Sequence, residues 1–163
     1  MFKGLKFVGA IAVVACAFGA PAFAQDACKA VTKTTGEVEQ EVVNAKGEKT
    51  KTLVAANKVV PGTEVIWTIT VSNPCKKPLE KPVINDPVPE HMSLVPGSVI
   101  GAGSDITYSV DGKTFATFDK LTVTQDGATR PARPEDIGQI RWEFHNSLQP
   151  GASAFGRFRA VLN

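Results

Sequence analysis

Residues 61–99 have the sequence PGTEVIWTITVSNPCKKPLEKPVINDPVPEHMSLVPGSV. After the Pro61-Gly62 turn, every second residue is apolar over one stretch: Val65, Trp67, Ile69 and Val71. This period of two is typical of a β-strand with one buried face, so we expect these four side chains to face the core and Thr68 and Thr70 to face solvent.

Prolines and polar turns fill the second half of the same segment. After the break at Asn73-Pro74, four further prolines follow: Pro78, Pro82, Pro87 and Pro89. Proline removes a backbone donor, which excludes a helix here and confines residues 81–85 to a short edge strand. The segment therefore predicts one half of an antiparallel β-sandwich.

Further strands are expected on both sides. Residues 37–43 and 49–55 flank Asn44-Ala45-Lys46-Gly47 and predict a charged hairpin at an edge. Asp111-Gly112 predicts a second hairpin and residues 121–124 a short strand, whereas the proline-containing residues 128–137 predict a loop. Residues 138–145 and 153–162 predict a final pair of strands, with Ile140, Trp142 and Phe144 on one face and a bulge near Gly156.

The predicted fold class is all-β. No stretch of ten residues after the N-terminal segment has a helical period, and eight or nine short strands meet at glycines and prolines. This pattern favours an Ig-like Greek-key antiparallel β-sandwich, with a closed barrel as the alternative.

The first 24 residues predict a cleaved signal peptide. Lys3 and Lys6 precede an apolar run over residues 7–18, and Ala22-Phe23-Ala24 supplies a cleavage site between Ala24 and Gln25. The run is shorter than the ~20 residues of a membrane-spanning helix. Lipidation at Cys16 after Val13-Val14-Ala15 is the alternative.

We expect a flexible lead-in over residues 25–36, followed by a single domain over residues 37–163.

Charge and cysteine content narrow the class of protein. Without Lys3 and Lys6, the 18 basic residues fall to 16, which equals the 16 acidic residues. A balanced chain gives no basic surface for nucleic acid.

Cys28 and Cys75 are the two cysteines that remain when Cys16 is removed with the predicted signal peptide. In an oxidising compartment they predict a disulfide. It would close a loop of about 48 residues, for which chain entropy gives about 4 kcal/mol.

Residues that could carry chemistry are few. His91 and His145 are the two histidines, fewer than a zinc site needs. Loop aspartates could bind calcium, but turn formation also accounts for them; they are Asp111, Asp119, Asp126 and Asp136. Gly101-Ala102-Gly103-Ser104-Asp105 lacks the nucleophile-elbow pattern. We therefore expect no catalytic residue, no metal site and no cofactor, and we expect Trp67 to belong to the core.

An isopeptide crosslink is a further possibility that the sequence leaves open. It would join Lys51 or Lys58 to Asn85 or Asp86, with loss of ammonia or water. Whether such a pair is buried together depends on the tertiary structure.

Several short motifs resemble a known family. They are Pro61-Gly62-Thr63, the strand over residues 65–73, Ile84-Asn85-Asp86-Pro87-Val88-Pro89, Val95-Pro96-Gly97-Ser98 and the closing residues 148–162. In this order they resemble the conserved repeat domain, the bacterial domain of unknown function numbered eleven, over about residues 53–163. The resemblance implies an Ig-like sandwich in exported proteins and no catalytic residues. This chain has one copy and an additional charged hairpin.

Three functions are compatible with the sequence. The first is a non-enzymatic periplasmic, secreted or cell-surface module that is structural or binds an envelope protein. The second is a subunit of a fibre or envelope assembly that is joined by addition of a strand to an edge. The third is a small hydrolytic or metal-dependent enzyme. The first is the prediction, with no nucleic-acid partner and no membrane span after signal cleavage.

Overall fold

The computed structural model describes residues 28–163. The elements in chain order are β1 (Val31–Val43), β2 (Lys49–Ala55), β3 (Glu64–Ser72), β4 (Val83–Pro87), β5 (Met92–Leu94), β6 (Ser104–Ser109), η1 (Phe118–Lys120), β7 (Thr122–Gln125), β8 (Ala128–Pro131), η2 (Pro134–Asp136), β9 (Gln139–Phe144) and β10 (Ser153–Leu162). The signal-peptide predictions, including Cys16 and the Ala24–Gln25 bond, lie outside the described residues.

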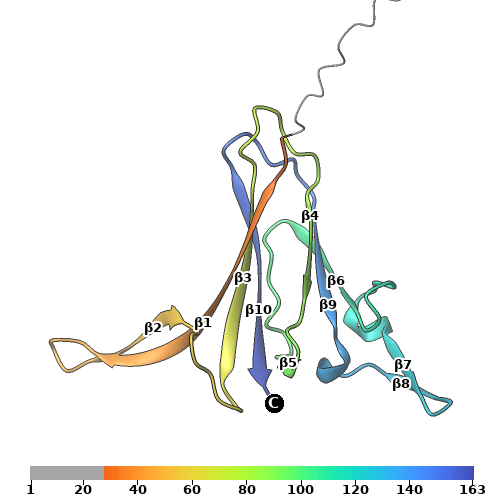
Figure 1. Cartoon of the computed structure of the whole chain (residues 1–163), viewed down its shortest axis with the longest axis horizontal. Coiled ribbons are helices and arrows are strands. Elements are labelled where there is room, and N and C mark those ends of the chain that lie inside the picture. Colours follow the sequence, from red (N-terminus) through yellow and green to blue (C-terminus); the bar gives the residue numbers. More distant parts are fainter. Residues whose placement is uncertain (1–27) are drawn as a thin grey trace, which may run out of the picture.

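Antiparallel strands form two facing sheets (Figure 1). The larger sheet has the order β2-β1-β3-β10-β5, and the smaller sheet has the order β4-β9-β6. Strands β7 and β8 form a separate hairpin. The all-β sandwich predicted from residues 61–99 is thus present.

The core lies between the two sheets. Ile69 and Val71 of β3 and Phe158 of β10 pack against Trp142 and Phe144 of β9. Trp67 is on the same inner face of β3 but is only partly buried, because at this level its ring lies beside Gly36 of β1. The predicted core positions of Ile69, Val71, Trp142 and Phe144 are confirmed, because all four side chains are buried. The prediction is only partly right for Trp67.

The last two strands differ from their predicted pairing. β9 pairs with β4 and β6, whereas β10 pairs with β3 and β5 in the other sheet. The connection through Pro150 and Gly151 therefore crosses from one sheet to the other. Two strands on opposite sides of a core carry the same apolar alternation as two paired strands, so their pattern cannot distinguish these arrangements.

The bulge expected near Gly156 is wrong. The register of β10 with β3 runs without interruption from Ser153 opposite Ser72 to Val161 opposite Glu64. Gly156 faces inward beneath the Trp142 ring, where a Cβ would lie 2.6 Å from two ring carbons. The glycine provides room for the indole across the sandwich.

Two segments expected to be irregular are strands. Residues 31–36 of the predicted lead-in form the first half of β1 and pair with β3. Residues 128–131 of the predicted loop form β8, which pairs with β7 across Asp126 and Gly127. Both turn residues have positive φ, 52° and 78°, as a two-residue hairpin turn requires.

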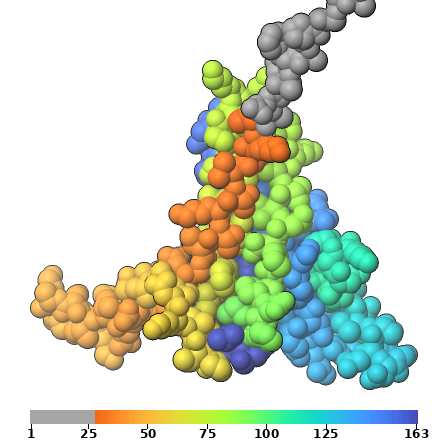
Figure 2. Space-filling model, in the orientation of Figure 1, coloured from red at the N-terminus to blue at the C-terminus, as the bar shows by residue number. Residues whose placement is uncertain are grey.

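Two hairpins extend from opposite sides of the sandwich (Figures 1 and 2). The predicted first hairpin is confirmed, with β2 at its expected bounds. Asn44 closes its turn by accepting backbone N–H bonds from Lys46 and Glu48, and Gly47 has a φ of 81°. Beyond Glu37, β1 pairs with β2 alone, so the outer part of this hairpin lies beyond the sandwich.

Candidate functional site

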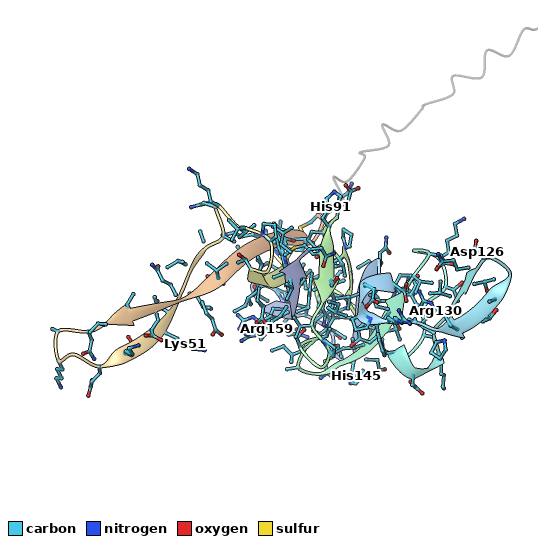
Figure 3. All side chains as sticks on the ribbon, turned by 90° about the horizontal axis from the view of Figure 1, so that it is seen from below. Lys51, His91, Asp126, Arg130, His145 and Arg159 are labelled. Atoms are coloured by element: carbon cyan, nitrogen blue, oxygen red, sulfur yellow. A yellow bond between two sulfur atoms is a disulfide. The ribbon has the colours of Figure 1, made fainter. Side chains whose placement is uncertain are left out.

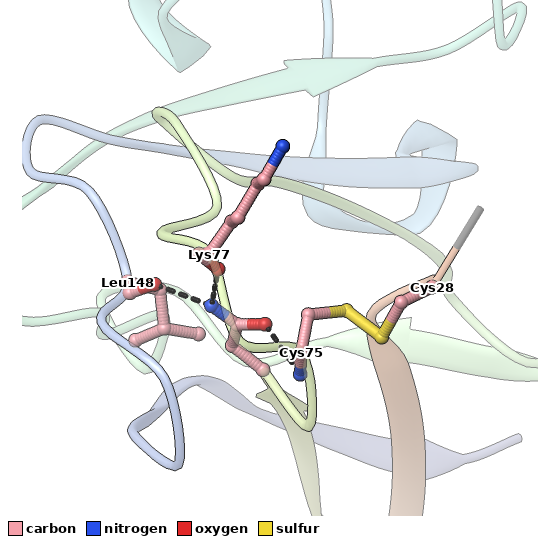
Figure 4. Close-up of a disulfide and its surroundings, with 5 residues drawn as sticks. Cys28, Cys75, Lys77 and Leu148 are labelled. Carbon is pink, nitrogen blue, oxygen red and sulfur yellow. Dashed lines mark hydrogen bonds between the residues drawn. A yellow bond between two sulfur atoms is a disulfide. The ribbon is translucent and has the colours of Figure 1, made fainter. Parts of the chain in front are cut away.

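Cys28 and Cys75 form the disulfide that the sequence predicts, with 5.7 Å between their Cα atoms. It links the residues just before β1 to the loop after β3 (Figure 4). Asn73 organises that loop: its buried side-chain amide donates to the carbonyls of Lys77 and Leu148, and its Oδ1 accepts from the Cys75 N–H. Buried amides that satisfy several backbone groups fix a loop firmly.

One face of the β1–β2 hairpin carries all the charged side chains of its paired residues 37–55. Ion pairs join Glu41 to Lys49 at 2.7 Å and Glu39 to Lys51 at 3.0 Å. Arg159 of β10 bridges Glu39 at 2.9 Å and Glu64 at 2.7 Å. Hydrogen bonds from Lys51 and then from Arg159 hold the pKa of Glu39 below its usual value. The base of the hairpin is therefore tied to the sandwich through Arg159.

The other face of the hairpin has no charge. It consists of the alternate residues Val38, Gln40, Val42, Thr50, Thr52 and Val54. This face continues the inner face of the large sheet past Gly36, at a point where no strand of the small sheet covers it. Because the charged and uncharged side chains are fully separated, the hairpin has one face suited to contact with another surface.

A pocket of about 220 Å³ lies at the base of this uncharged face. Its lining comes from the hairpin, the loop that follows it and the body: Gly36, Ala55, Ala56, Asn57, Val59, Val65, Trp67 and Met92. The buried Nε1 of Trp67 has no hydrogen-bond partner among the described residues. An unpaired buried donor costs about 1–3 kcal/mol, so the Trp67 indole carries an energetic penalty at this junction.

The two histidines are far apart (Figure 3). His145 lies near the end of β9, with its Nε2 3.0 Å from Oδ1 of Asp105, and both side chains are exposed. His91 is exposed in the turn before β5, with a φ of 62°. Within residues 28–163, no group of three metal-ligating side chains comes together.

The loop aspartates act locally rather than together. Asp111 accepts bonds from the backbone of Lys113 and Thr114 and from the Ser109 hydroxyl. The two carboxylate oxygens of Asp136 accept hydrogen bonds from the two terminal nitrogens of Arg130, at 2.6 and 2.9 Å. Backbone hydrogen bonds lower the pKa of Asp111 to about 2, and the Arg130 hydrogen bonds lower that of Asp136 to about 2. Asp119 belongs to η1, and Asp126 lies at the β7–β8 turn.

Asp86 is the carboxyl whose environment the sequence did not reveal. It lies on β4 directly opposite Ile140 of β9, which has Tyr108 of β6 on its other side. Partial burial raises the pKa of Asp86 to about 6 and also raises that of Tyr108. Only the pairing of β4 with β9 places this carboxyl beside an apolar neighbour, and that pairing joins residues distant in the sequence.

Two of the residues considered for an isopeptide crosslink have other hydrogen-bond partners. Lys51 donates to Glu39 within the hairpin, and Asn85 accepts from Nε of Arg141 in the small sheet. Lys58 is exposed in the loop after β2. Lys51 and Asn85 are thus each paired with another side chain, and Asp86 lies opposite Ile140 of β9.

A search of residues 28–163 for a helix long and apolar enough to cross a membrane finds none. No protein family model matches the chain, and no curated protein and no solved structure matches it. The resemblance to the conserved repeat domain family stays a prediction from the quoted motifs.

Proposed function

We propose that the protein is an exported, non-enzymatic β-sandwich of the Ig-like Greek-key class that binds a protein of the cell envelope or cell surface through the β1–β2 hairpin. The observation that carries this proposal is the projecting hairpin with one charged and one uncharged face. The disulfide supports export, because such bonds persist in oxidising compartments.

The energetics of the hairpin favour a role in binding. Two-stranded hairpins are at best marginally stable in water, and ordering each residue costs roughly 1–2 kcal/mol. No side chain between residues 28 and 64 is fully buried, so the hairpin adds little to the core in return. A partner that covers Val42 and its neighbours would supply the missing burial.

Addition of a partner strand is the second candidate, and the position of β2 favours it. β2 is the outermost strand of the large sheet, so within residues 28–163 no further strand pairs with its outer backbone groups. Lys49 and Lys51 along this strand oppose pairing with a basic or identical edge. A strand that pairs here would carry acidic residues.

Crosslinking in intact cells tests the binding role. A photoreactive residue placed at Val42, on the uncharged face, is expected to capture a defined envelope protein. The same residue placed at Thr129 of the β7–β8 hairpin is the matched control, because Thr129 is also exposed on a projecting hairpin. Equal capture from both positions, or none from Val42, contradicts the proposal.

Export has its own measurement. Intact-mass analysis of the protein from the cell envelope is expected to give a chain that begins at Gln25 and contains one disulfide. A lipid-modified chain that begins at Cys16 contradicts the predicted cleavage.

A further inference from the structure

We propose that the segment of residues 28–55, here called the exchange segment, can be exchanged between two copies of this chain. In the exchanged dimer, β1 of each copy pairs with β3 of the other, and Cys28 of each copy bonds to Cys75 of the other. This inference goes beyond the envelope-binding role and does not depend on it, because it concerns the β1–β3 contact rather than the hairpin tip.

The core does not need the exchange segment. The first fully buried side chain of the described residues is that of Val65, after the segment ends. All members of the main apolar cluster that are buried come from Ile69 onward. The sandwich therefore has the same core whichever copy supplies β1.

The contacts that hold the segment are the same in both arrangements. They are the backbone ladder between residues 31–37 and 66–72, the Arg159–Glu39 ion pair and the disulfide. In an exchanged dimer each contact is made once per copy, as in the monomer. Exchange of an identical element is a low-cost route to a dimer for this reason.

The connection between segment and body can serve as a hinge. The connection begins after Ala56, whose N–H donates to the Gly36 carbonyl and so holds it to the hairpin. It ends at Gly62, whose N–H donates to the Leu162 carbonyl of the body. Asn57, Lys58 and Val60 between these anchors are exposed. The pocket of about 220 Å³ beneath Asn57 and Val59 shows that this connection is not closely packed on Trp67.

Cys75 is held by the body and not by β1. Oδ1 of Asn73 accepts from the Cys75 N–H, and its amide nitrogen donates to the carbonyls of Lys77 and Leu148, all of which belong to the body. A second copy therefore presents Cys75 in the same position to an incoming Cys28. Two thiols lose two protons and two electrons to form the bond, and oxidised glutathione, which accepts them, is the oxidant in the test below.

A complementation experiment tests the exchange. The Cys28→Ser and Cys75→Ser variants of the chain from Gln25 to Asn163 are unfolded, mixed and refolded at high concentration in a glutathione redox buffer. Neither variant alone can form the Cys28–Cys75 bond. The mixture is expected to give a heterodimer whose single disulfide joins Cys28 of one chain to Cys75 of the other, identified by peptide mass mapping. A mixture that stays monomeric overturns the proposal.

A second readout separates exchange from simple crosslinking of two folded monomers. Arg159→Lys is introduced into the Cys28→Ser chain, and a zero-length carboxyl–amine crosslinker is applied to the heterodimer. Because Glu39 lies at the other end of the β1–β3 contact from Cys28, exchange predicts a crosslink between Glu39 of one chain and the introduced amine of the other. Glu39 also lies 3.0 Å from Lys51 of its own hairpin, so a Glu39–Lys51 link is expected in either arrangement. A heterodimer in which the introduced amine is linked to Glu39 of its own chain, and not to Glu39 of the other, overturns the proposal.

Hinge length provides a test that keeps both cysteines. Deletion of Lys58 and Val59 shortens the connection and strains the closed monomer, which favours exchange. We expect the dimer fraction after refolding to rise about tenfold relative to the wild type. Insertion of two glycines at the same place is the matched control and should lower it. Equal dimer fractions in both variants contradict the hinge assignment.

Discussion

Trp142 is the side chain around which the two sheets close. It is fully buried, its Nε1 donates to the Ile100 carbonyl at 3.0 Å, and its ring faces Phe158 at 6.4 Å between centroids. Gly156 on β10 and Gly101 in the loop before β6 both leave room for the indole. The indole is therefore held by two glycines as well as by apolar packing.

Gly156→Ala should destabilise the protein by about 1–3 kcal/mol, because the new methyl group would overlap the Trp142 ring. Urea unfolding followed by tryptophan fluorescence measures the change. Gly138→Ala is the matched control, since its Cβ would meet the nearest backbone oxygen at 3.6 Å, an ordinary contact. Equal losses in both variants would show that the close approach is not the cause.

Asp86 should make stability depend on pH between about 4 and 6. Burial raises its pKa from 3.8 to about 6 in the folded protein. Well below pH 4 the carboxyl is neutral in both states and carries no penalty. As the pH rises to 6, the unfolded chain ionises first, so folding stability falls. Because the side chain is only partly buried, we expect a loss of at most about 1 kcal/mol.

Asp86→Asn should remove this part of the pH dependence, measured as the difference in unfolding free energy between variant and wild type at pH 4 and pH 7. Asp126→Asn, at the β7–β8 turn, is the control and should leave the wild-type profile. Asp111 and Asp136 have lowered pKa values and lose their stabilisation only as the pH falls from about 4 to 2, in a separate window. An unchanged profile for Asp86→Asn would contradict the assignment.

The β1–β2 hairpin combines two different parts. Residues 31–37 of β1 belong to the sandwich. Beyond Val38 the backbone of β1 pairs only with β2, and the Glu39 side chain reaches back to Arg159. Ile66 illustrates how the base is covered: it points outward but is 3% exposed, because Arg159 and Glu37 lie directly beside it. The aliphatic stem of an arginine can cover apolar surface while its charged group forms ion pairs.

Removal of the hairpin tip should leave the sandwich stable. Val38 and Val54 are directly opposite, so residues 39–53 can be replaced by an Asn-Gly turn. We expect the thermal midpoint to change by no more than about 2 °C, because no side chain of the tip is fully buried. The Glu39–Arg159 ion pair is also lost, but it is partly exposed to solvent, where such pairs contribute little. Differential scanning calorimetry measures it.

The matched truncation removes the β7–β8 hairpin from Val123 to Arg130 and should lower the midpoint clearly. Val123 packs against the core cluster, and Arg130 forms the bidentate ion pair with Asp136. Equal effects of the two truncations would contradict the distinction between a supported and an unsupported hairpin.

The whole molecule is less compact than its length implies. Both hairpins extend away from the sandwich (Figure 2). A compact chain of roughly 140 residues has a radius of gyration of about 14 Å. Small-angle X-ray scattering of the chain from Gln25 should give a larger value, and the tip truncation should bring it closer to the compact value. A wild-type value of about 14 Å would show that the hairpin folds back onto the body.

The sequence by itself determined those strands and turns that are marked by a local residue pattern. The alternation of Val65, Ile69 and Val71 identified β3 correctly. The Asn44–Gly47 turn identified the first hairpin, and the two cysteines identified the disulfide. The β8 strand was missed because Pro131 and nearby charges indicate a loop, although Asp126-Gly127 is a hairpin signal. Asp86 carried no local signal, since burial of a carboxyl depends on residues distant in the chain.

Tertiary structure alone decided which strands share a sheet. Alternation is a property of each strand and is the same whether its neighbour is hydrogen-bonded beside it or packed across the core. β9 and β10 are therefore indistinguishable from a hairpin in the sequence, yet they lie in opposite sheets with Trp142 set against Gly156. Residues 61–99 therefore predicted a sandwich from the alternation within β3. That β1 pairs with β3 along one edge became visible only in the assembled sheet.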